Sequence, residues 1–361
     1  MRGNQATFRG ALLGLAVGDA MGNAVDRKSL EEIRRDYGPN GLLGYDLVNG
    51  YAEVTSYTQV AAFAANGLLL GLTRSQTTSL VRYIGVALRE WSRSQQYCEP
   101  ERNYCWLSTV PELKRRRCMD TRMLDALSRE TLGTPEEPVY RSNQPSGLTE
   151  VIPAALLSGI LEMEPDAVDR MGAEILALTH GDPSAFLSGA VLVHALCLLM
   201  RQPDISPEEL LRDTVDAVQL QFGREYGQTT GIWELLQLAM TLASSEETGQ
   251  MEAMELLRCR TAPEVLAGAL YACITCHGDF DAAMITAVNH SGRSAAVGAV
   301  TGAALGIKMG EGALPEFYLE SLEPAKLLRE LADDLAQGNP ADRVSTLFDD
   351  DWDRKYLHGG V

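Results

Sequence analysis

Aromatic residues make up only 6% of this 361-residue sequence. Runs of β-branched or aromatic residues, which favour strands, are few, whereas alanine, leucine and methionine are common, so the composition favours helices. No apolar stretch approaches the ~20 residues that a bilayer-spanning helix needs. A secretory pattern is also lacking, because Gly14 interrupts the first apolar stretch and Asp19 follows it. We therefore expect a cytoplasmic protein without a membrane-spanning segment.

Positive charge is scarce as well, and the formal net charge is -18 at pH 7. Such an acidic excess disfavours binding to nucleic acid and to anionic lipid. The basic stretch from Lys114 to Arg117 is an exception, but charges on about one helical turn are more often a solvated surface than a nucleic-acid site. The sequence therefore predicts neither a nucleic-acid partner nor a membrane partner, and it indicates no particular protein partner.

The seven cysteines are an odd number in a long chain without a secretory pattern, so free thiols are expected. Cys273 and Cys276, followed by His277, match the string that attaches c-type haem. That attachment needs export, and the string lies at the end of an apolar helical stretch, so we expect no haem. Zinc would need a second ligand pair at suitable spacing, and none is evident.

Helical patterns run through most of the chain and cross every candidate boundary. The sequence therefore predicts one compact all-α domain over residues 1–361. The expected helical segments are Phe8–Met21, Gln59–Leu72, Thr78–Ser94, Met119–Arg129, Ile152–Glu162, Asp166–Thr179, Pro183–Arg201, Pro207–Gln219, Gly231–Leu242, Pro263–Ile274, Ala295–Ile307 and Pro324–Ala336. Loops are expected at 38–50, 132–147 and 244–249, and residues 316–361 hold the last helix and an acidic tail.

Two of these segments carry glycine at every fourth position, which places the glycines along one helix face. They are Gly10, Gly14, Gly18 and Gly22 in the first segment, and Gly298, Gly302 and Gly306 near the other end. Glycine costs about 1 kcal/mol against alanine inside a helix, so such a stripe needs a reason. We expect these two helices to pack closely in the core.

Four separated motifs carry a further signal, and their order and spacing fit across roughly residues 5–315. They are GALLGLAVGDAMG at 10–22 with Asp26 after it, VTSYTQV at 54–60, LTHGDP at 178–183 and NHSGRSAAVG at 289–298. Together they resemble the motifs of the ADP-ribosylglycohydrolase family. The resemblance implies that family's all-α fold, in agreement with the helical patterns.

The resemblance also implies a chemistry, namely hydrolysis of the glycosidic bond of ADP-ribose attached to an acceptor. Family members use two magnesium ions, held by two clusters of acidic residues. Where the first cluster usually reads Thr-Asp-Asp, this sequence keeps Thr55 but has Ser56 and Tyr57. Asp26 stands where the family has a metal-contacting glutamate. The first cluster has thus lost both aspartates.

The second cluster usually reads Asp-x-Asp-Ser/Thr, and here its positions hold Arg293, Ala295 and Ala296. Alanine offers no lone pair to a metal, and arginine is a fixed cation. We therefore expect no magnesium site and no other cofactor. We also expect Arg293 to occupy the vacated position and to pair with Asp26 or Asp19, unless it points to solvent.

A glycine-rich loop that contacts ADP-ribose in relatives is about three residues shorter here, at 143–153. Two functions stay open. One is a non-catalytic relative that binds ADP-ribose or a related small molecule, or acts in regulation or structure. The alternative is a metal-independent hydrolase in the same pocket. Hydrolysis through a single remaining magnesium ion is a weaker third option, because Thr55, Ser56 and Asp26 make a poor octahedral set.

Candidate acid–base residues are Asp19, Asp26, His180, Asp182 and His290. The opposing interpretation is that Asp19 bonds a helix end and that the two histidines are packed structural residues. Expected pocket residues are Asp19, Asp26, Thr55, Ser56, Tyr57, Gly147, Asn289, Ser291, Gly292, Arg293 and Ser294.

Overall fold

The structure is a computed structural model that describes residues 4–74, 80–96, 98, 103–226, 231–338 and 350–360. These residues form eighteen α-helices and three short 3-10 helices, with no strand among them, which confirms the all-α fold class. The α-helices are α1 (Gln5–Asn23), α2 (Leu30–Tyr37), α3 (Ser56–Thr73), α4 (Leu80–Gln95), α5 (Pro111–Lys114), α6 (Thr121–Ser128), α7 (Ile152–Leu161), α8 (Pro165–Ala177), α9 (Pro183–Arg201), α10 (Pro207–Tyr226), α11 (Ile232–Ala243), α12 (Gln250–Leu256), α13 (Ala262–Thr275), α14 (Phe280–Val288), α15 (Ser294–Met309), α16 (Glu316–Ser321), α17 (Ala325–Gln337) and α18 (Asp350–Tyr356). The 3-10 helices are η2 (Trp106–Thr109), η3 (Leu148–Val151) and η4 (Glu311–Ala313).

Each of the twelve predicted helical segments coincides with a helix, although residues 78 and 79 of one segment lie outside the described residues. The helices that the sequence analysis missed are α2, α5, α12, α14, α16 and α18. None of them exceeds nine residues. A segment of two turns shows too few repeats of the 3.6-residue period to be recognised.

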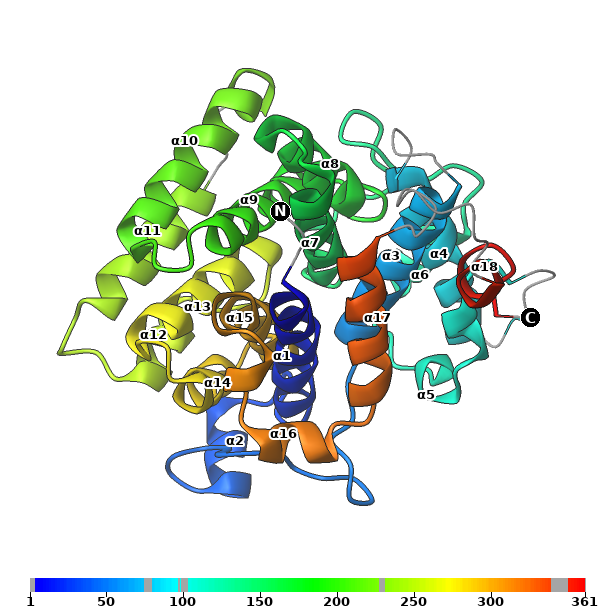
Figure 1. Cartoon of the computed structure of the whole chain (residues 1–361). Helices are drawn as coiled ribbons and strands as arrows, with labels where there is room; N and C mark the ends of the chain where they lie inside the picture. Colours follow the sequence, from blue (N-terminus) through cyan, green and yellow to red (C-terminus); the bar gives the residue numbers. More distant parts are fainter. Residues whose placement is uncertain are drawn as a thin grey trace.

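The two glycine-striped helices, α1 and α15, lie side by side at the centre of the molecule (Figure 1). They run antiparallel: a Cβ atom added to Gly14 would lie 2.1 Å from the carbonyl oxygen of Gly302, and one added to Gly18 would lie 1.9 Å from that of Gly298. Any side chain at these positions would overlap the partner backbone. The predicted close packing of the two helices is therefore confirmed.

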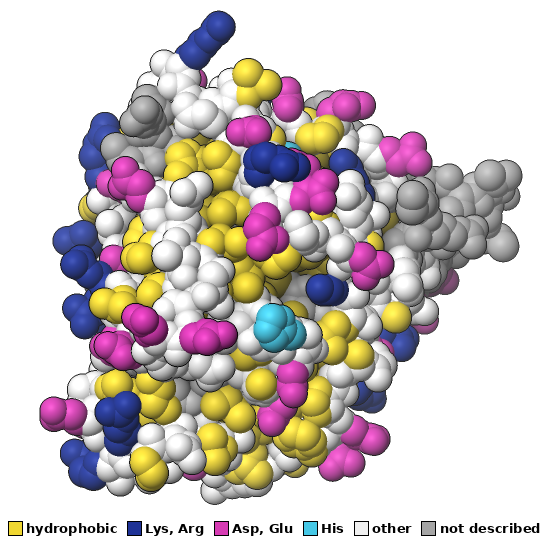
Figure 2. All heavy atoms as spheres, turned by 90° about the vertical axis from the view of Figure 1, so that its left-hand side faces the viewer, with side chains coloured by type: hydrophobic (Ala, Val, Ile, Leu, Met, Phe, Trp, Pro, Cys, Tyr) yellow, Lys and Arg dark blue, Asp and Glu magenta, His cyan; other side chains and the backbone are white. Residues whose placement is uncertain are grey.

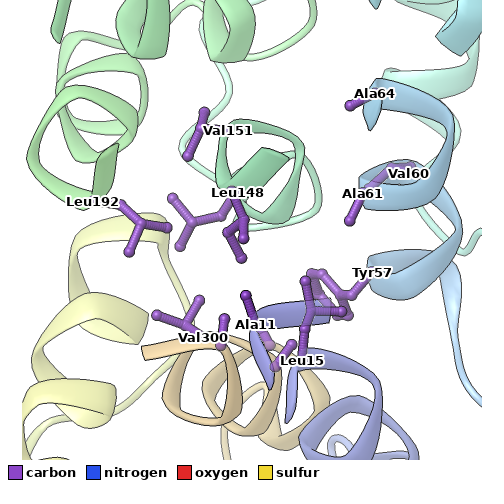
Figure 3. Close-up of a cluster of buried hydrophobic side chains, with 14 of the residues drawn as sticks. Ala11, Leu15, Tyr57, Val60, Ala61, Ala64, Leu148, Val151, Leu192 and Val300 are labelled. Atoms are coloured by element: carbon purple, nitrogen blue, oxygen red, sulfur yellow. The ribbon is translucent and has the colours of Figure 1, made fainter. Parts of the chain in front are cut away.

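The hydrophobic core surrounds this helix pair. Figure 3 shows apolar side chains from α1, α3, η3, α9 and α15 converging on one region. Helix α3 is buried along nearly its whole length, from Ser56 to Leu72. Burial on every face explains why its sequence is apolar without a polar stripe.

One described helix, α9, is long and apolar enough to cross a membrane by length and composition. The expectation of no such stretch was therefore too strict. However, 67% of the apolar window of α9 is buried inside the fold, and the core helices of soluble proteins pass the same test. All seven cysteines are free, as predicted.

Candidate functional site

A cavity of about 620 Å³ opens beside the point where α15 begins. Its walls come from the link after α1, the start of α3, the segment leading into α6, the loop before η3 and the first residues of α15. The lining residues are Asn23, Asp26, Arg27, Glu53, Val54, Thr55, Ser56, Tyr57, Arg117, Met119, Asp120, Thr121, Arg122, Gln144, Ser146, Arg293 and Ala295. Four arginines and three carboxylates thus face one space.

Asp19, on α1, lies behind this cavity and is completely buried. Its carboxylate accepts hydrogen bonds from the backbone N–H and the hydroxyl of Thr55, at 2.8 and 2.6 Å, and from the same groups of Thr58, at 3.0 and 2.6 Å. Burial raises the pKa of Asp19 to about 6, against the opposing effect of these hydrogen bonds. Asp19 therefore joins the N-terminus of α3 to α1 by hydrogen bonds. This agrees with the interpretation that Asp19 bonds a helix end.

The start of α3 forms one wall of the cavity. Thr55 precedes the helix, and its hydroxyl accepts the backbone N–H of Tyr57 at 3.2 Å while it donates to Asp19. Tyr57 is only 7% exposed, and burial raises its pKa far above the usual value. Its phenol therefore stays neutral and offers the cavity an aromatic surface.

Asp26 faces the cavity across from α3. Its carboxylate lies 3.4 Å from the guanidinium of Arg27 and accepts the backbone N–H of Ala295 at 3.2 Å, at the positive end of α15. Burial raises the pKa of Asp26, and the charges of Arg293 and Arg27 partly offset this. Asp26 is thus held by a neighbouring residue and by a helix terminus.

Arg293 does not form the ion pair that we expected with Asp26 or Asp19. Its Nη2 donates to Oε1 of Gln144 at 2.6 Å, while Asp19 is saturated by threonine donors and Asp26 pairs with Arg27. The side chain is partly buried at the cavity, so the alternative of a solvent-directed arginine is wrong as well. Gln144 is a neutral partner, which leaves the positive charge of Arg293 uncompensated by direct pairing.

A cluster of three polar side chains lies at the opposite wall. The hydroxyl of Ser146 donates to Asp120, and Nε2 of His180 lies 3.4 Å from Oδ2 of Asp120 and 3.3 Å from the Ser146 hydroxyl. Burial raises the pKa of Asp120, but the hydrogen bonds from His180 and Ser146 outweigh it and leave that pKa well below the usual range. Asp120 and Ser146 line the cavity, whereas His180 supports them from behind.

A family model described as ADP-ribosylglycohydrolase matches residues 3–344. The chain belongs to the ADP-ribosylglycohydrolase family. A solved structure titled "ADP-ribosylglycohydrolase-related protein complex" shares 23% sequence identity with it, at a TM-score of 0.56, covering 93% of this chain and 99% of that one. At this identity the likeness shows the fold alone. No curated protein matches the chain.

Five of the pocket residues expected from the ADP-ribosylglycohydrolase motifs line the cavity: Asp26, Thr55, Ser56, Tyr57 and Arg293. Those that do not line it are Asp19, Gly147, Asn289, Ser291, Gly292 and Ser294. Two of the second group, Asp19 and Gly147, lie next to residues that line or support the wall. A Cβ atom added to Gly147, for example, would lie 3.1 Å from Nδ1 of His180.

The NHSG part of the fourth family motif is structural. Asn289 exchanges two hydrogen bonds with the backbone of Leu42, at 2.8 and 2.9 Å, and Ser291 donates to Glu255. His290 is fully buried between the carbonyl oxygen of Ala287 and the N–H of Gly292, both at 3.0 Å from its ring. Burial lowers the pKa of His290 to about 4, so it is neutral.

Two further candidates also have local structural roles. Asp182 caps α9, because its carboxylate accepts the N–H and the hydroxyl of Ser184 at 2.9 and 2.6 Å. Ser294 donates to the carbonyl oxygen of His290 at 3.2 Å. Neither residue lines the cavity.

Sequence reasoning missed several residues of the cavity wall: Arg27, Glu53, Arg117, Met119, Asp120, Arg122, Gln144 and Ser146. One signal was available in the basic stretch 114–117, which was interpreted as a solvated surface. Lys114, Arg115 and Arg116 are indeed exposed, but Arg117 is only 10% exposed and pairs with Glu323 at 2.7 Å. A second signal was Asp120, whose carboxylate caps the N-terminus of α6 by accepting the backbone N–H of Arg122.

Proposed function

We propose that this member of the family is non-catalytic and binds an ADP-ribose-like nucleotide in the 620 Å³ cavity without magnesium. The observation that carries the proposal is Arg293, a guanidinium at the cavity that is held by the neutral side chain of Gln144. By resemblance, this position carries a metal-binding aspartate in relatives. In this chain a positively charged side chain would thus stand where relatives have a carboxylate that binds a metal ion.

The oxygen atoms at this place do not suit a pair of magnesium ions. The hydroxyl of Thr55 is already engaged by Asp19, and Ala295 contributes only a backbone N–H, which Asp26 accepts. Octahedral magnesium wants several carboxylate or hydroxyl oxygens. A divalent ion about 5 Å from a guanidinium would also be repelled by several kcal/mol at an effective dielectric near 20. These points support loss of the metal pair.

The remaining charges favour a phosphorylated ligand. Arginine offers a planar fork of donors that matches phosphate oxygens. Arg122 is exposed on the first turn of α6 and forms no ion pair within the described residues, so its guanidinium is available. Met119 lines the same cavity with 73% of its surface exposed. A thioether packs well against an aromatic ring, so Met119 suits the base of a nucleotide.

The test is calorimetric titration with ADP-ribose, in EDTA and in millimolar magnesium. We expect the same affinity in both solutions, and about tenfold weaker binding for Arg293→Gln and for Arg122→Gln. Lys308→Gln is the matched control, because it removes one positive charge remote from this cavity. Binding that requires magnesium would contradict the proposal, and so would the absence of binding in both solutions.

A second function has one specific observation in its favour, namely the contact of Asp120 and Ser146 with His180. A carboxylate of low pKa is ionised at neutral pH and is a weak base, so it suits the stabilisation of a positively charged sugar intermediate. A metal-independent hydrolase would use Asp120 in this way. We would measure release of ADP-ribose from an ADP-ribosylated peptide in EDTA. Release that Asp120→Asn abolishes would favour the hydrolase, and no release would favour the non-catalytic member.

A further inference from the structure

A second cavity lies on another face of the molecule, between α9, α10, α11, α13 and α15. It has a volume of about 140 Å³ and shares no lining residue with the first cavity. Its walls are almost entirely aliphatic. Figure 2 views the side of the molecule that carries α10 and α11, where hydrophobic side chains gather in a depression. An apolar cavity of this size can remain dry and take up a small organic molecule.

One hydroxyl in this wall has no partner. Thr214, on α10, lines the cavity at 2% exposure, and its Oγ1 forms no hydrogen bond. A threonine inside a helix can bond a carbonyl of the preceding turn, but this one does not. Its oxygen is covered by the surrounding side chains, so a ligand in the cavity does not reach it, and removal of this hydroxyl should leave ligand binding unchanged.

A positive charge lies at the same cavity. Lys308, in the last turn of α15, is exposed and forms no ion pair within the described part of the chain. It is close enough to Cys273, another lining residue, for its charge to act on that thiol. The cavity thus combines an aliphatic interior with one ammonium group that forms no ion pair within the described residues.

We propose that this cavity binds a small carboxylic acid with an alkyl or aryl body of about six carbons. The size follows from the volume, which is close to that of an engineered apolar cavity that accepts benzene. The hydrocarbon body fills the aliphatic interior, and Lys308 pairs with the carboxylate. This site is independent of the nucleotide proposed for the first cavity.

The test uses heptanoate and its neutral analogue 1-heptanol, followed by ligand-observed NMR on the full chain. We expect heptanoate to bind with a millimolar or lower dissociation constant. Ala304→Leu fills the cavity and should abolish binding of both compounds. Lys308→Gln should weaken heptanoate about fivefold and leave 1-heptanol unchanged, whereas Thr214→Val should leave the binding of both compounds unchanged.

The melting temperature of each variant serves as the control for correct folding. Thr214→Val should leave it unchanged, because this substitution removes an unsatisfied hydroxyl. Lys308→Gln changes an exposed residue, so it should not affect folding and provides a second test of ligand binding. No binding of heptanoate at tens of millimolar, or equal binding to wild type and Ala304→Leu, would overturn the proposal. ADP-ribose should not displace heptanoate, and displacement would also count against a separate site.

Discussion

Gln144 accepts a hydrogen bond from Arg293 at 2.6 Å, which joins the loop before η3 to the residue that precedes α15. A neutral amide orients the guanidinium without cancelling its charge. A carboxylate partner would have oriented the guanidinium and also neutralised its charge. The cavity would then attract an anion less strongly. The contact therefore holds a positive charge at the cavity, as the proposed binding of an anionic ligand requires.

Replacing Arg293 by alanine should accordingly have a small effect on stability. The loss is one hydrogen bond of a partly buried side chain, about 1 kcal/mol. In a chain of this length that corresponds to a fall in melting temperature of about 2 °C. Differential scanning calorimetry would measure it. A fall of 6 °C or more would show that Arg293 is a structural centre of the fold.

Restoring the carboxylates should restore a metal site, if their replacement is what removed it. We expect the fourfold variant Ser56→Asp, Tyr57→Asp, Arg293→Asp, Ala295→Asp to gain thermal stability in millimolar magnesium, because the ions would screen carboxylates that otherwise repel one another. The matched control places asparagine at the same four positions. Stabilisation of wild type by magnesium to the same extent would contradict this expectation.

Asp19 should impose a specific pH dependence on stability. Its pKa is about 6 in the folded chain, against 3.8 for a free aspartate side chain, because burial disfavours the charged form. The stability that protonated Asp19 contributes is therefore complete below about pH 4 and is lost as the pH rises through 6. Over this window the wild type should lose on the order of 3 kcal/mol relative to Asp19→Asn. Urea unfolding of both proteins at several pH values would measure the difference, and parallel curves would disprove it.

His290 should remain neutral in mildly acidic solution. Burial lowers its pKa to about 4 from 6.5, so its contribution to stability is present above 6.5 and is lost as the pH falls through 4. NMR of selectively labelled histidine should show no change of the His290 ring signals between pH 7 and about pH 5. Imidazole added to the same sample serves as the titrating reference. A His290 titration that follows imidazole would mean that the ring is accessible.

The glycine contact between α1 and α15 should tolerate no side chain. A Cβ atom on Gly18 would lie 1.9 Å from the carbonyl oxygen of Gly298, and backbone cannot yield as a flexible side chain does. We expect Gly18→Ala to destabilise the chain by more than about 4 kcal/mol, measured by urea unfolding. Gly159→Ala is the control: nothing lies within 4 Å of its added Cβ in α7, so it should be neutral or slightly stabilising.

The fold could be predicted from the sequence because its signals are local and periodic. Long helices such as α9 repeat their pattern several times, and the glycine stripes of α1 and α15 have few explanations other than close contact. The short helices α2 and α14 do not repeat enough to be seen. Their caps, Ser29 and Asp279, are visible only once the helix is known.

The candidate site could be predicted only where it coincides with family motifs. Thr55, Tyr57 and Arg293 were found in this way, but Asp120 lies in a segment without such a motif, and Gln144 lies in the shortened loop 143–153, of which only Gly147 was predicted. Their place in the cavity depends on how the segment before α6 and the loop before η3 approach α15, and no periodicity encodes that approach. For the same reason the partner of Arg293 could not be predicted, since a distance between remote side chains decides it.

The paired glycines also have a consequence for how the site can vary. The C-terminal end of α1 leads to Asp26 and the N-terminal end of α15 follows Arg293, so two backbones in direct contact set the separation of these residues. The contact between the two backbones does not depend on which side chains line the cavity. Acids can therefore be exchanged for an arginine or an alanine there while the width of the opening is conserved. A scaffold of this kind keeps its dimensions while its chemistry changes, so overall shape alone does not reveal which ligand such a relative selects.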